Sequence, residues 1–170
     1  MTSDRDQDRV RVELHVRSLA PRAGRRRQNA VIDRLDDLES AGRIDEFAVD
    51  VWGRQVGLSS AAARTDAGRF VLDRVAEFRE WADETGRSVA SFFETRRVDS
   101  ELSGEQYTAL VLPSLTLAEY RGGDLAHVAP CSDGGEVTTV SDRIDVLAAT
   151  SGTVSQPTDR QPISAEAEEE

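Results

Sequence analysis

The sequence predicts a single α+β domain whose helices pack on one sheet, and three observations lead to this prediction. Two segments near the start alternate apolar and polar residues with the period of a strand, and a segment of helical periodicity lies between them, which makes a βαβ unit. A longer helical pattern follows this unit. The later part of the chain holds two strand-like runs that flank a Gly-Gly pair, and then a short helical pattern. This order of helices and hairpin-joined strands is typical of α+β domains.

The first strand is predicted within residues 10–19, VRVELHVRSL, where apolar and polar residues alternate strictly. This period is typical of a half-buried strand, with one face on the core and the other toward solvent. The expected apolar face consists of Val10, Val12, Leu14 and Val16, and the expected polar face consists of Arg11, Glu13, His15 and Arg17.

The next two elements complete the βαβ unit. A helix is predicted over about 24–41, because apolar residues recur at helical spacing and Gly42 can end the helix in the left-handed conformation. A second strand is predicted within residues 46–56, EFAVDVWGRQV, which alternate again. The apolar helix positions are Val31, Leu35 and Leu38, and the strand would carry Phe47, Val49 and Val51 opposite Ala48, Asp50 and Trp52.

A long helix is predicted over about 66–85 from an apolar stripe that recurs every three or four residues. Thr65 or Asp66 can cap the start of this helix, and Gly86 can close its end. The residues of the stripe are Phe70, Val71, Val75, Phe78, Trp81 and Ala82.

The part after this helix is predicted to form strands. Residues 88–98 suggest one short strand. Residues 106–131 suggest one long or interrupted strand, a turn at Gly122-Gly123 and a return strand, because two β-rich runs flank a dipeptide that tolerates positive φ. Pro113 should mark a bulge or an edge of the sheet, since proline cannot donate to a ladder.

The domain is predicted to span residues 9–150 and to end with a short helix over 142–149, capped by Ser141. A chain of 170 residues is long enough for one core and short for two. Residues 1–8 and 151–170 are polar and are predicted to be disordered, because they contain too little apolar surface to offset the entropy of ordering.

The composition is typical of proteins from extreme halophiles. The net charge is −11, and all 21 basic residues are arginine. Such an acidic surface stays hydrated in molar salt. Cys131 is the only cysteine, the first residues are polar and acidic without an apolar signal segment, and no run approaches the length of a membrane span. We therefore expect a soluble, cytoplasmic protein without membrane contact.

The sequence contains no recognisable catalytic, metal-binding or cofactor motif. His15 and His127 are the only histidines, and neither they nor Cys131 stand at a metal-ligand spacing. The two histidines would be neighbours if their strands pair, but no third ligand accompanies them. A lone cysteine at a strand end is more often a packing residue than a nucleophile, which needs an activated thiolate. We expect no cofactor, no metal ion and no enzyme activity.

A cluster of arginines at the start of the first predicted helix is the strongest functional signal. Residues 9–27 contain seven arginines and one acidic residue, Glu13, in an otherwise acidic chain. The helix dipole disfavours cations at this end, so a bound anion is one explanation of the cluster. The other explanation is a solvated or structural role, in which the arginines pair with acidic groups. The candidate nucleic-acid-binding or anion-binding residues are Arg22, Arg25, Arg26 and Arg27.

Three stretches resemble haloarchaeal proteins described as helix-turn-helix domain proteins: RLDDLESAGRIDEFAVDVWG, RTDAGRFVLDRVAEFREWA and VAPCSDGGEVTTVSDRIDVL. The resemblance spans about residues 10–150 and implies a role in transcription regulation. The segment RLDDLESAGRIDEF resembles the last helix and wing entry of winged-helix regulators, although VRVELHV directly upstream is predicted to be a strand.

Two functional hypotheses remain open at this point. In the first, the protein is a non-catalytic regulator that contacts DNA through the arginine cluster as a homodimer. In the second, it is an α+β interaction or ligand-sensing module that binds an acidic partner or a small anion through the same residues.

Overall fold

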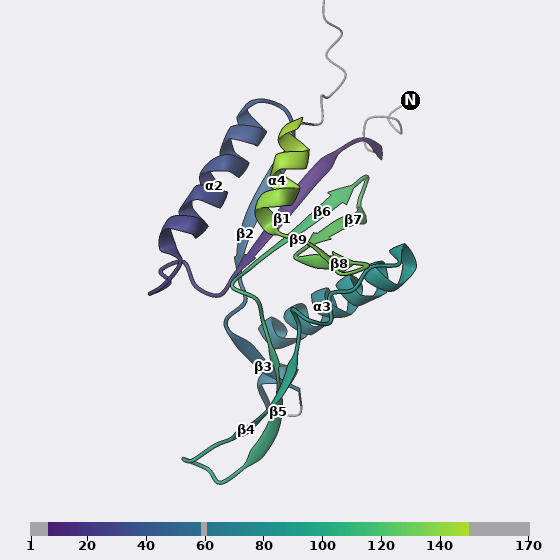
Figure 1. Cartoon of the computed structure of the whole chain (residues 1–170). Coiled ribbons are helices and arrows are strands. Elements are labelled where there is room, and N and C mark those ends of the chain that lie inside the picture. Colours follow the sequence, from purple (N-terminus) through teal and green to yellow (C-terminus); the bar gives the residue numbers. More distant parts are fainter. Residues whose placement is uncertain (1–6, 59–60, 150–170) are drawn as a thin grey trace, which may run out of the picture.

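A computed structural model describes residues 7–58 and 61–149. Its centre is a four-stranded mixed sheet with the strand order β2-β1-β6-β7. Helices α2 and α4 cover one face of this sheet and α3 covers the other (Figure 1). The predicted α+β fold is therefore confirmed. The predicted tail 151–170 and most of the predicted tail 1–8 lie outside the described residues.

The predicted βαβ unit is present at the start of the domain. It consists of β1 (Val10–Val16), α2 (Arg25–Ser40) and β2 (Glu46–Val51), and the two strands are parallel neighbours. The apolar positions of α2 are buried against the sheet, and Gly42 follows the helix with φ +71° as predicted.

The strand β1 is buried on both faces, so the prediction of a half-buried strand is wrong. It lies between β2 and β6 (Leu115–Arg121), and α3 packs over the face that carries its polar residues. Glu13 and His15 on this face are only 3% and 0% exposed. Alternation in the sequence shows which residues are polar but not whether they face solvent. Here ion pairs make it possible to bury the polar residues.

The long helix α3 (Asp66–Thr85) agrees with its prediction at both ends. The Thr65 hydroxyl accepts a hydrogen bond from the Gly68 N–H at 3.0 Å, and Gly86 closes the helix with φ +71°. A short 3₁₀ turn, η1 (Ala61–Arg64), precedes it. The predicted apolar stripe is buried except for Phe70, which is 37% exposed.

A second sheet of three strands extends away from the body of the molecule (Figure 1). Its strand order is β3-β5-β4, with β3 (Gln55–Gly57), β5 (Gln106–Val111) and β4 (Thr95–Asp99). The predicted strand over 46–56 is therefore two strands in different sheets. The chain changes direction at Gly53, whose φ of +84° cannot continue a strand.

Pro113 lies between β5 and β6 and belongs to neither strand. The prediction that it marks a bulge or an edge is wrong, because the chain leaves the second sheet and enters the central sheet at this residue. Proline stands at this crossing because no ladder hydrogen bond is needed there. The irregularity in the sheet lies instead between Glu119 and Tyr120.

The described part of the chain ends with hairpins and a helix. The predicted Gly122-Gly123 turn joins β6 to β7 (Asp124–Ala129). A small hairpin of β8 (Cys131–Asp133) and β9 (Glu136–Thr138), which was not predicted, precedes α4 (Val140–Ala149).

The cap of α4 is Thr139 rather than the predicted Ser141. The Thr139 hydroxyl accepts a hydrogen bond from the Asp142 N–H at 3.2 Å, and the Asp142 carboxylate accepts one from the Thr139 N–H at 2.8 Å. This reciprocal pair is a capping box, and it starts the helix before Ser141.

The core consists of two apolar clusters, one on each side of the central sheet. One cluster lies under α2 and α4 and includes Leu14, Leu35 and Ile144. The other lies under α3 and includes Phe78 and Phe93. Among the helices in the described ranges, none is both long enough and apolar enough to cross a membrane.

Candidate nucleic-acid interface

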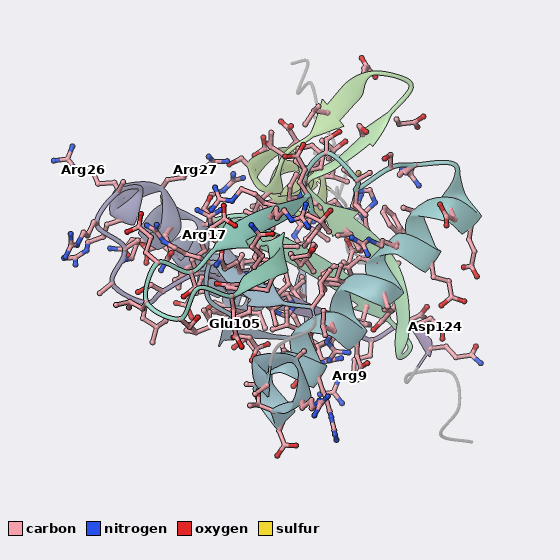
Figure 2. The ribbon with its side chains drawn as sticks, turned by 90° about the horizontal axis from the view of Figure 1, so that it is seen from below. Arg9, Arg17, Arg26, Arg27, Glu105 and Asp124 are labelled. Carbon is pink, nitrogen blue, oxygen red and sulfur yellow. The ribbon has the colours of Figure 1, made fainter. Side chains whose placement is uncertain are left out.

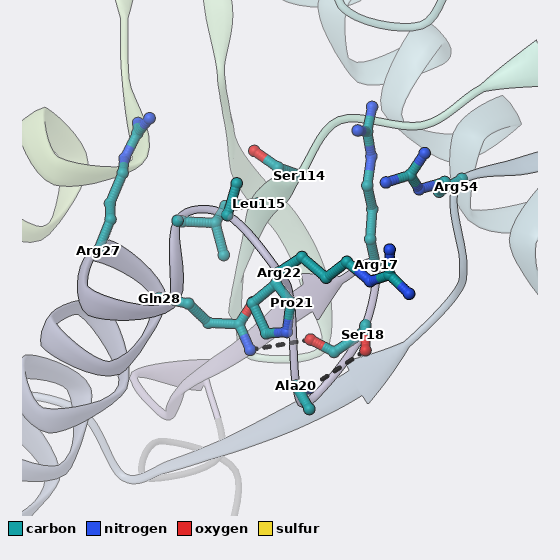
Figure 3. Close-up of a pocket in the computed structure, with 12 residues that line it drawn as sticks. Arg17, Ser18, Ala20, Pro21, Arg22, Arg27, Gln28, Arg54, Ser114 and Leu115 are labelled. Carbon is teal, nitrogen blue, oxygen red and sulfur yellow. Dashed lines mark hydrogen bonds between the residues drawn. The ribbon is translucent and has the colours of Figure 1, made fainter.

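A cavity of about 540 Å³ opens where β1 ends and α2 begins. Its walls come from the β1–α2 connection, the first turn of α2, the turn before β3 and the start of β6 (Figure 3). In sheets with parallel strands, ligands bind at this place, beyond the carboxyl end of a strand and beside the start of the next helix. The fold thus positions the cavity where an anion is readily bound.

The β1–α2 connection is shaped by a buried glutamine and a glycine. The Gln28 side-chain amide donates a hydrogen bond to the Ser18 carbonyl at 2.9 Å, and Gln28 is only 4% exposed. Gly24 directly precedes α2 with φ +78°, and no side chain caps the start of the helix. The first backbone N–H groups of α2 therefore have no side-chain acceptor.

Four arginines line the cavity, and no acidic residue does. Arg17 follows β1, Arg22 lies in the connection, Arg27 lies in the first turn of α2 and Arg54 directly precedes β3. Figure 3 shows the side chains of Arg17 and Arg54 together on one side of the cavity and Arg27 on the other.

Arg17 is held in place beneath this cavity. Its Nε donates a hydrogen bond to the Leu112 carbonyl at 2.8 Å. Burial, and then the charge of Arg54, lower the pKa of Arg17 below its ordinary value. The two guanidinium groups are therefore close enough to repel each other, and an anion between them would replace repulsion with attraction.

Six arginines elsewhere in the described residues form ion pairs with carboxylates: Arg9, Arg11, Arg34, Arg74, Arg121 and Arg143. Two buried glutamates are each held by two arginines: Glu13 by Arg11 and Arg74, and Glu119 by Arg121 and Arg143. In the part of the chain that the structure describes, none of the four cavity arginines takes part in an ion pair. A structural role in ion pairs therefore explains those six arginines and does not explain the four that line the cavity.

Of the four arginines predicted from the sequence, the structure brings two to the cavity. Arg22 and Arg27 line it, whereas Arg25 and Arg26 are exposed and do not. Figure 2 shows Arg26 at the outer end of α2, pointing away from the body. Successive residues of a helix point about 100° apart, so three consecutive arginines cannot share one direction.

Arg17 and Arg54 were not predicted as site residues. The alternation of the first strand assigns Arg17 to a polar face, although it also belongs to the basic segment 9–27. Arg54 follows the second strand of the βαβ unit, and parallel strands end at the same edge of a sheet. The strand predicted within residues 46–56 contained Arg54, and Gly53 was the available signal that the strand ends before it.

The arrangement can bind an oxyanion. A guanidinium group donates two parallel hydrogen bonds to a phosphate or a carboxylate, which gives both affinity and a defined geometry. The uncapped start of α2 adds backbone N–H groups and the positive end of the helix dipole. Phosphate groups of a nucleic acid and small organic anions both meet these requirements.

A second cluster of polar groups lies under α3. The ring of His15 is fully buried and stacks on Trp52, with 4.6 Å between ring centroids. Its Nε2 lies 3.3 Å from Glu13 Oε2, and its Nδ1 lies 4.0 Å from Asp50 Oδ2. The three side chains are close enough to be considered as metal ligands. The two carboxylates lie at opposite ring nitrogens, and neither contact meets hydrogen-bond geometry in the described structure.

His127 and Cys131 form a separate buried pair, with 3.9 Å between Nε2 and Sγ. Burial, and then the charges of Arg143 and Arg87, lower the pKa of His127 to about 4, while burial raises the pKa of the Cys131 thiol. A thiol with a raised pKa lacks the thiolate character that a nucleophile needs. His15 and His127 are not on neighbouring strands, because β6 separates β1 from β7.

In the described residues, strands separate each α-helix from the next. β2 and β3 separate α2 from α3, and the strands β4 to β9 separate α3 from α4. The four-residue turn η1 is the only helical segment, among the described residues, that directly precedes a helix.

Comparison with known proteins gives one match. Residues 4–152 match a family model described as a helix-turn-helix domain. No curated protein and no solved structure matches the chain.

Proposed function

Since the chain belongs to this helix-turn-helix domain family, we propose that it is a non-catalytic regulator of transcription that contacts DNA through the arginine cavity at the start of α2. The observation that carries this proposal is a set of four arginines that line one cavity and bind no carboxylate of the described chain. A phosphate of the DNA backbone is an anion of the required charge and geometry.

In this proposal the arginine cavity replaces a recognition helix. Helix-turn-helix proteins place the second helix of a close pair in the major groove, and strands separate the described helices of this chain. Phosphate contacts in the cavity would position the protein on the duplex. Arg25 and Arg26 are exposed beside the cavity and are the side chains available to neighbouring phosphates or base edges.

We also propose that the protein works in the cytoplasm of a haloarchaeon, which the charge of −11 and the exclusive use of arginine support. In molar salt the release of counterions contributes little to DNA affinity. Binding then depends on bidentate guanidinium contacts, which a fixed Arg17 favours. A homodimer would present two such cavities to one duplex and gain affinity without new kinds of contact.

Retention of fragmented genomic DNA by the protein in about 2 M KCl tests the proposal, because this salt suppresses non-specific phosphate binding. Three double variants separate the explanations. The first carries Arg22→Gln and Arg27→Gln in the cavity, and the second carries Arg25→Gln and Arg26→Gln beside it. The third is the control, with Arg64→Gln and Arg69→Gln at exposed positions of η1 and α3 and the same change in net charge.

We expect the wild type and the control variant to retain selected DNA fragments, and the cavity variant to lose them while its circular dichroism stays unchanged. The variant of Arg25 and Arg26 should retain the same fragments more weakly. A wild-type protein that retains no DNA would contradict the proposal, and so would an equal loss in the cavity and control variants.

A further inference from the structure

A second cavity, of about 380 Å³, adjoins the arginine cavity. The two have three lining residues in common: Arg27, Ser114 and Leu115. Because the same side chains line both, the two cavities are adjacent at the first turn of α2 and the start of β6, and we refer to them together as the groove.

The second cavity has a mixed wall, with six apolar residues beside Arg27, Ser91, Ser114 and Thr139. Phe92, Pro113, Pro130 and Val140 contribute to its wall, together with Val137 of β9. Val137 is 53% exposed, so the wall contains an apolar side chain that the described fold leaves open to solvent. Sites for small molecules are typically cavities of this size, apolar over most of their wall, with a few polar groups that fix orientation.

The opposite end of the groove is cationic. Arg17 and Arg54 lie together there, and Arg27 stands at the junction with the second cavity. A ligand that occupies the whole groove must therefore carry negative charge at one end and apolar surface at the other.

We propose that the groove binds a small organic anion whose phosphate or carboxylate head is held by Arg17 and Arg54, whose middle passes Arg27 and whose apolar body lies along Phe92 and Val137. An inorganic anion would leave the apolar wall in water, and a neutral apolar compound would leave the arginines without an anion. This site goes beyond DNA contact and does not require it. The ligand uses cavity arginines that the DNA backbone would also use, so the two would compete.

Calorimetric titration of the full chain in the absence of DNA tests this site. The probes are phenyl phosphate and 3-phenylpropionate, with inorganic phosphate and acetate as heads alone and benzyl alcohol as an apolar body alone. We expect at least one aromatic anion to bind about tenfold more tightly than its own head, because the ring buries apolar surface. Benzyl alcohol should bind more weakly than that anion. The stronger of the two aromatic anions identifies the head that the arginines prefer.

Two variants locate the binding. Arg54→Gln should weaken the binding of the stronger aromatic anion and of its head alone equally, by about tenfold, because a bidentate contact is lost. Val137→Ser should reduce the advantage of the aromatic anion and leave the affinity for the head unchanged. The controls are Arg69→Gln and Leu102→Ser, which change an exposed arginine and a fully exposed leucine outside the groove and should change neither affinity.

Equal affinities for each aromatic anion and its head alone would overturn the inference. Unchanged binding in both Arg54→Gln and Val137→Ser would overturn it as well. The inference and the proposed function fail separately: DNA retention without ligand binding contradicts only the ligand site, and ligand binding without DNA retention contradicts only the DNA-binding role.

Discussion

At the scale of single residues, Glu13 is a buried carboxylate that stays ionised because of its neighbours. Burial alone would raise its pKa, but the ring of His15 and the charge of Arg74 outweigh this effect and lower the pKa to about 2. Arg11 and Arg74 hold the same carboxylate oxygen, at 2.8 and 2.9 Å. The ion pairs of Glu13 thus explain how a polar face of β1 can lie inside the protein.

Glu13 should make the stability of the protein sensitive to acid. In the unfolded chain its pKa is near 4.5, so between pH 4.5 and 2 the unfolded state binds a proton that the folded state does not. This contribution is present above pH 4.5 and is lost as the pH falls toward 2. Glu13→Gln should lower the free energy of unfolding at pH 7 by about 3 kcal/mol and flatten its fall in that range. Urea unfolding at several pH values measures both effects, with the exposed Glu101→Gln as control, and an unchanged slope in Glu13→Gln would contradict the prediction.

His127 should make the free energy of unfolding depend on pH in a second range, above that of Glu13. Its pKa falls from an ordinary 6.5 to about 4 in the folded state, so the unfolded state binds the extra proton between these values. The free energy of unfolding should therefore decrease as the pH is lowered from 6.5 to 4 and stop changing on this account below 4. His127→Gln should remove this decrease in thermal or urea unfolding. A decrease of the same size in the variant would show that another group is responsible.

At the scale of elements, α3 is the helix whose sequence signals and structure agree most closely. The cap at Thr65, the stripe over the core and the left-handed Gly86 each point to the same boundaries. This agreement arises because helix ends depend on local chemistry. The apolar clusters on both sides of the sheet depend instead on which elements meet in space.

Both ends of α3 can be tested by substitution. Thr65→Ala should lower the free energy of unfolding by about 1 kcal/mol, because the Gly68 N–H loses its acceptor. Gly86→Ala should lower it by about 1–2 kcal/mol, since alanine is strained at φ +71°. Thr65→Ser keeps the hydroxyl and should stay close to the wild type in urea unfolding. Equal losses for alanine and serine at position 65 would rule out the capping explanation.

The elements that the sequence did not reveal have physical reasons in common. β3, β8 and β9 contain three residues each, too few to show a period. The break at Gly53 and the crossing at Pro113 depend on the existence of a second sheet, which no local pattern announces. The candidate site follows the same division: Arg22 and Arg27 were predicted from a local cluster, whereas Arg54 reaches the cavity only through the pairing of β1 with β2.

At the scale of the whole molecule, the net negative charge lowers the stability of the folded state. The chain carries 32 acidic residues against 21 arginines, and the excess repels itself in the folded state. The Debye length falls from about 10 Å at 0.1 M salt to about 3 Å at 1 M, so salt should remove most of this repulsion.

Raising KCl from about 0.1 to 2 M should therefore raise the Tm, with most of the gain below about 1 M. Differential scanning calorimetry at fixed pH measures the change. The gain should shrink near pH 4, where carboxylates without strong ion pairs become protonated and the net charge falls. A Tm that is independent of KCl at neutral pH would contradict the role of charge repulsion and would remove one support for a haloarchaeal origin.

The position of β1 also predicts which backbone amides near the groove open to solvent most readily. This strand is paired at both edges and covered on both faces, and Arg17 follows it directly, whereas residues 18–24 lie in no helix or strand. In hydrogen–deuterium exchange the amides of β1 should therefore be among the last to exchange, and those of residues 18–24 among the first. A bound anion should slow exchange in residues 18–24 and leave β1 unchanged. β1 would then be the rigid part of the binding site, and residues 18–24 would become ordered around the bound anion. The rate at which residues 18–24 open would set the residence time of the ligand.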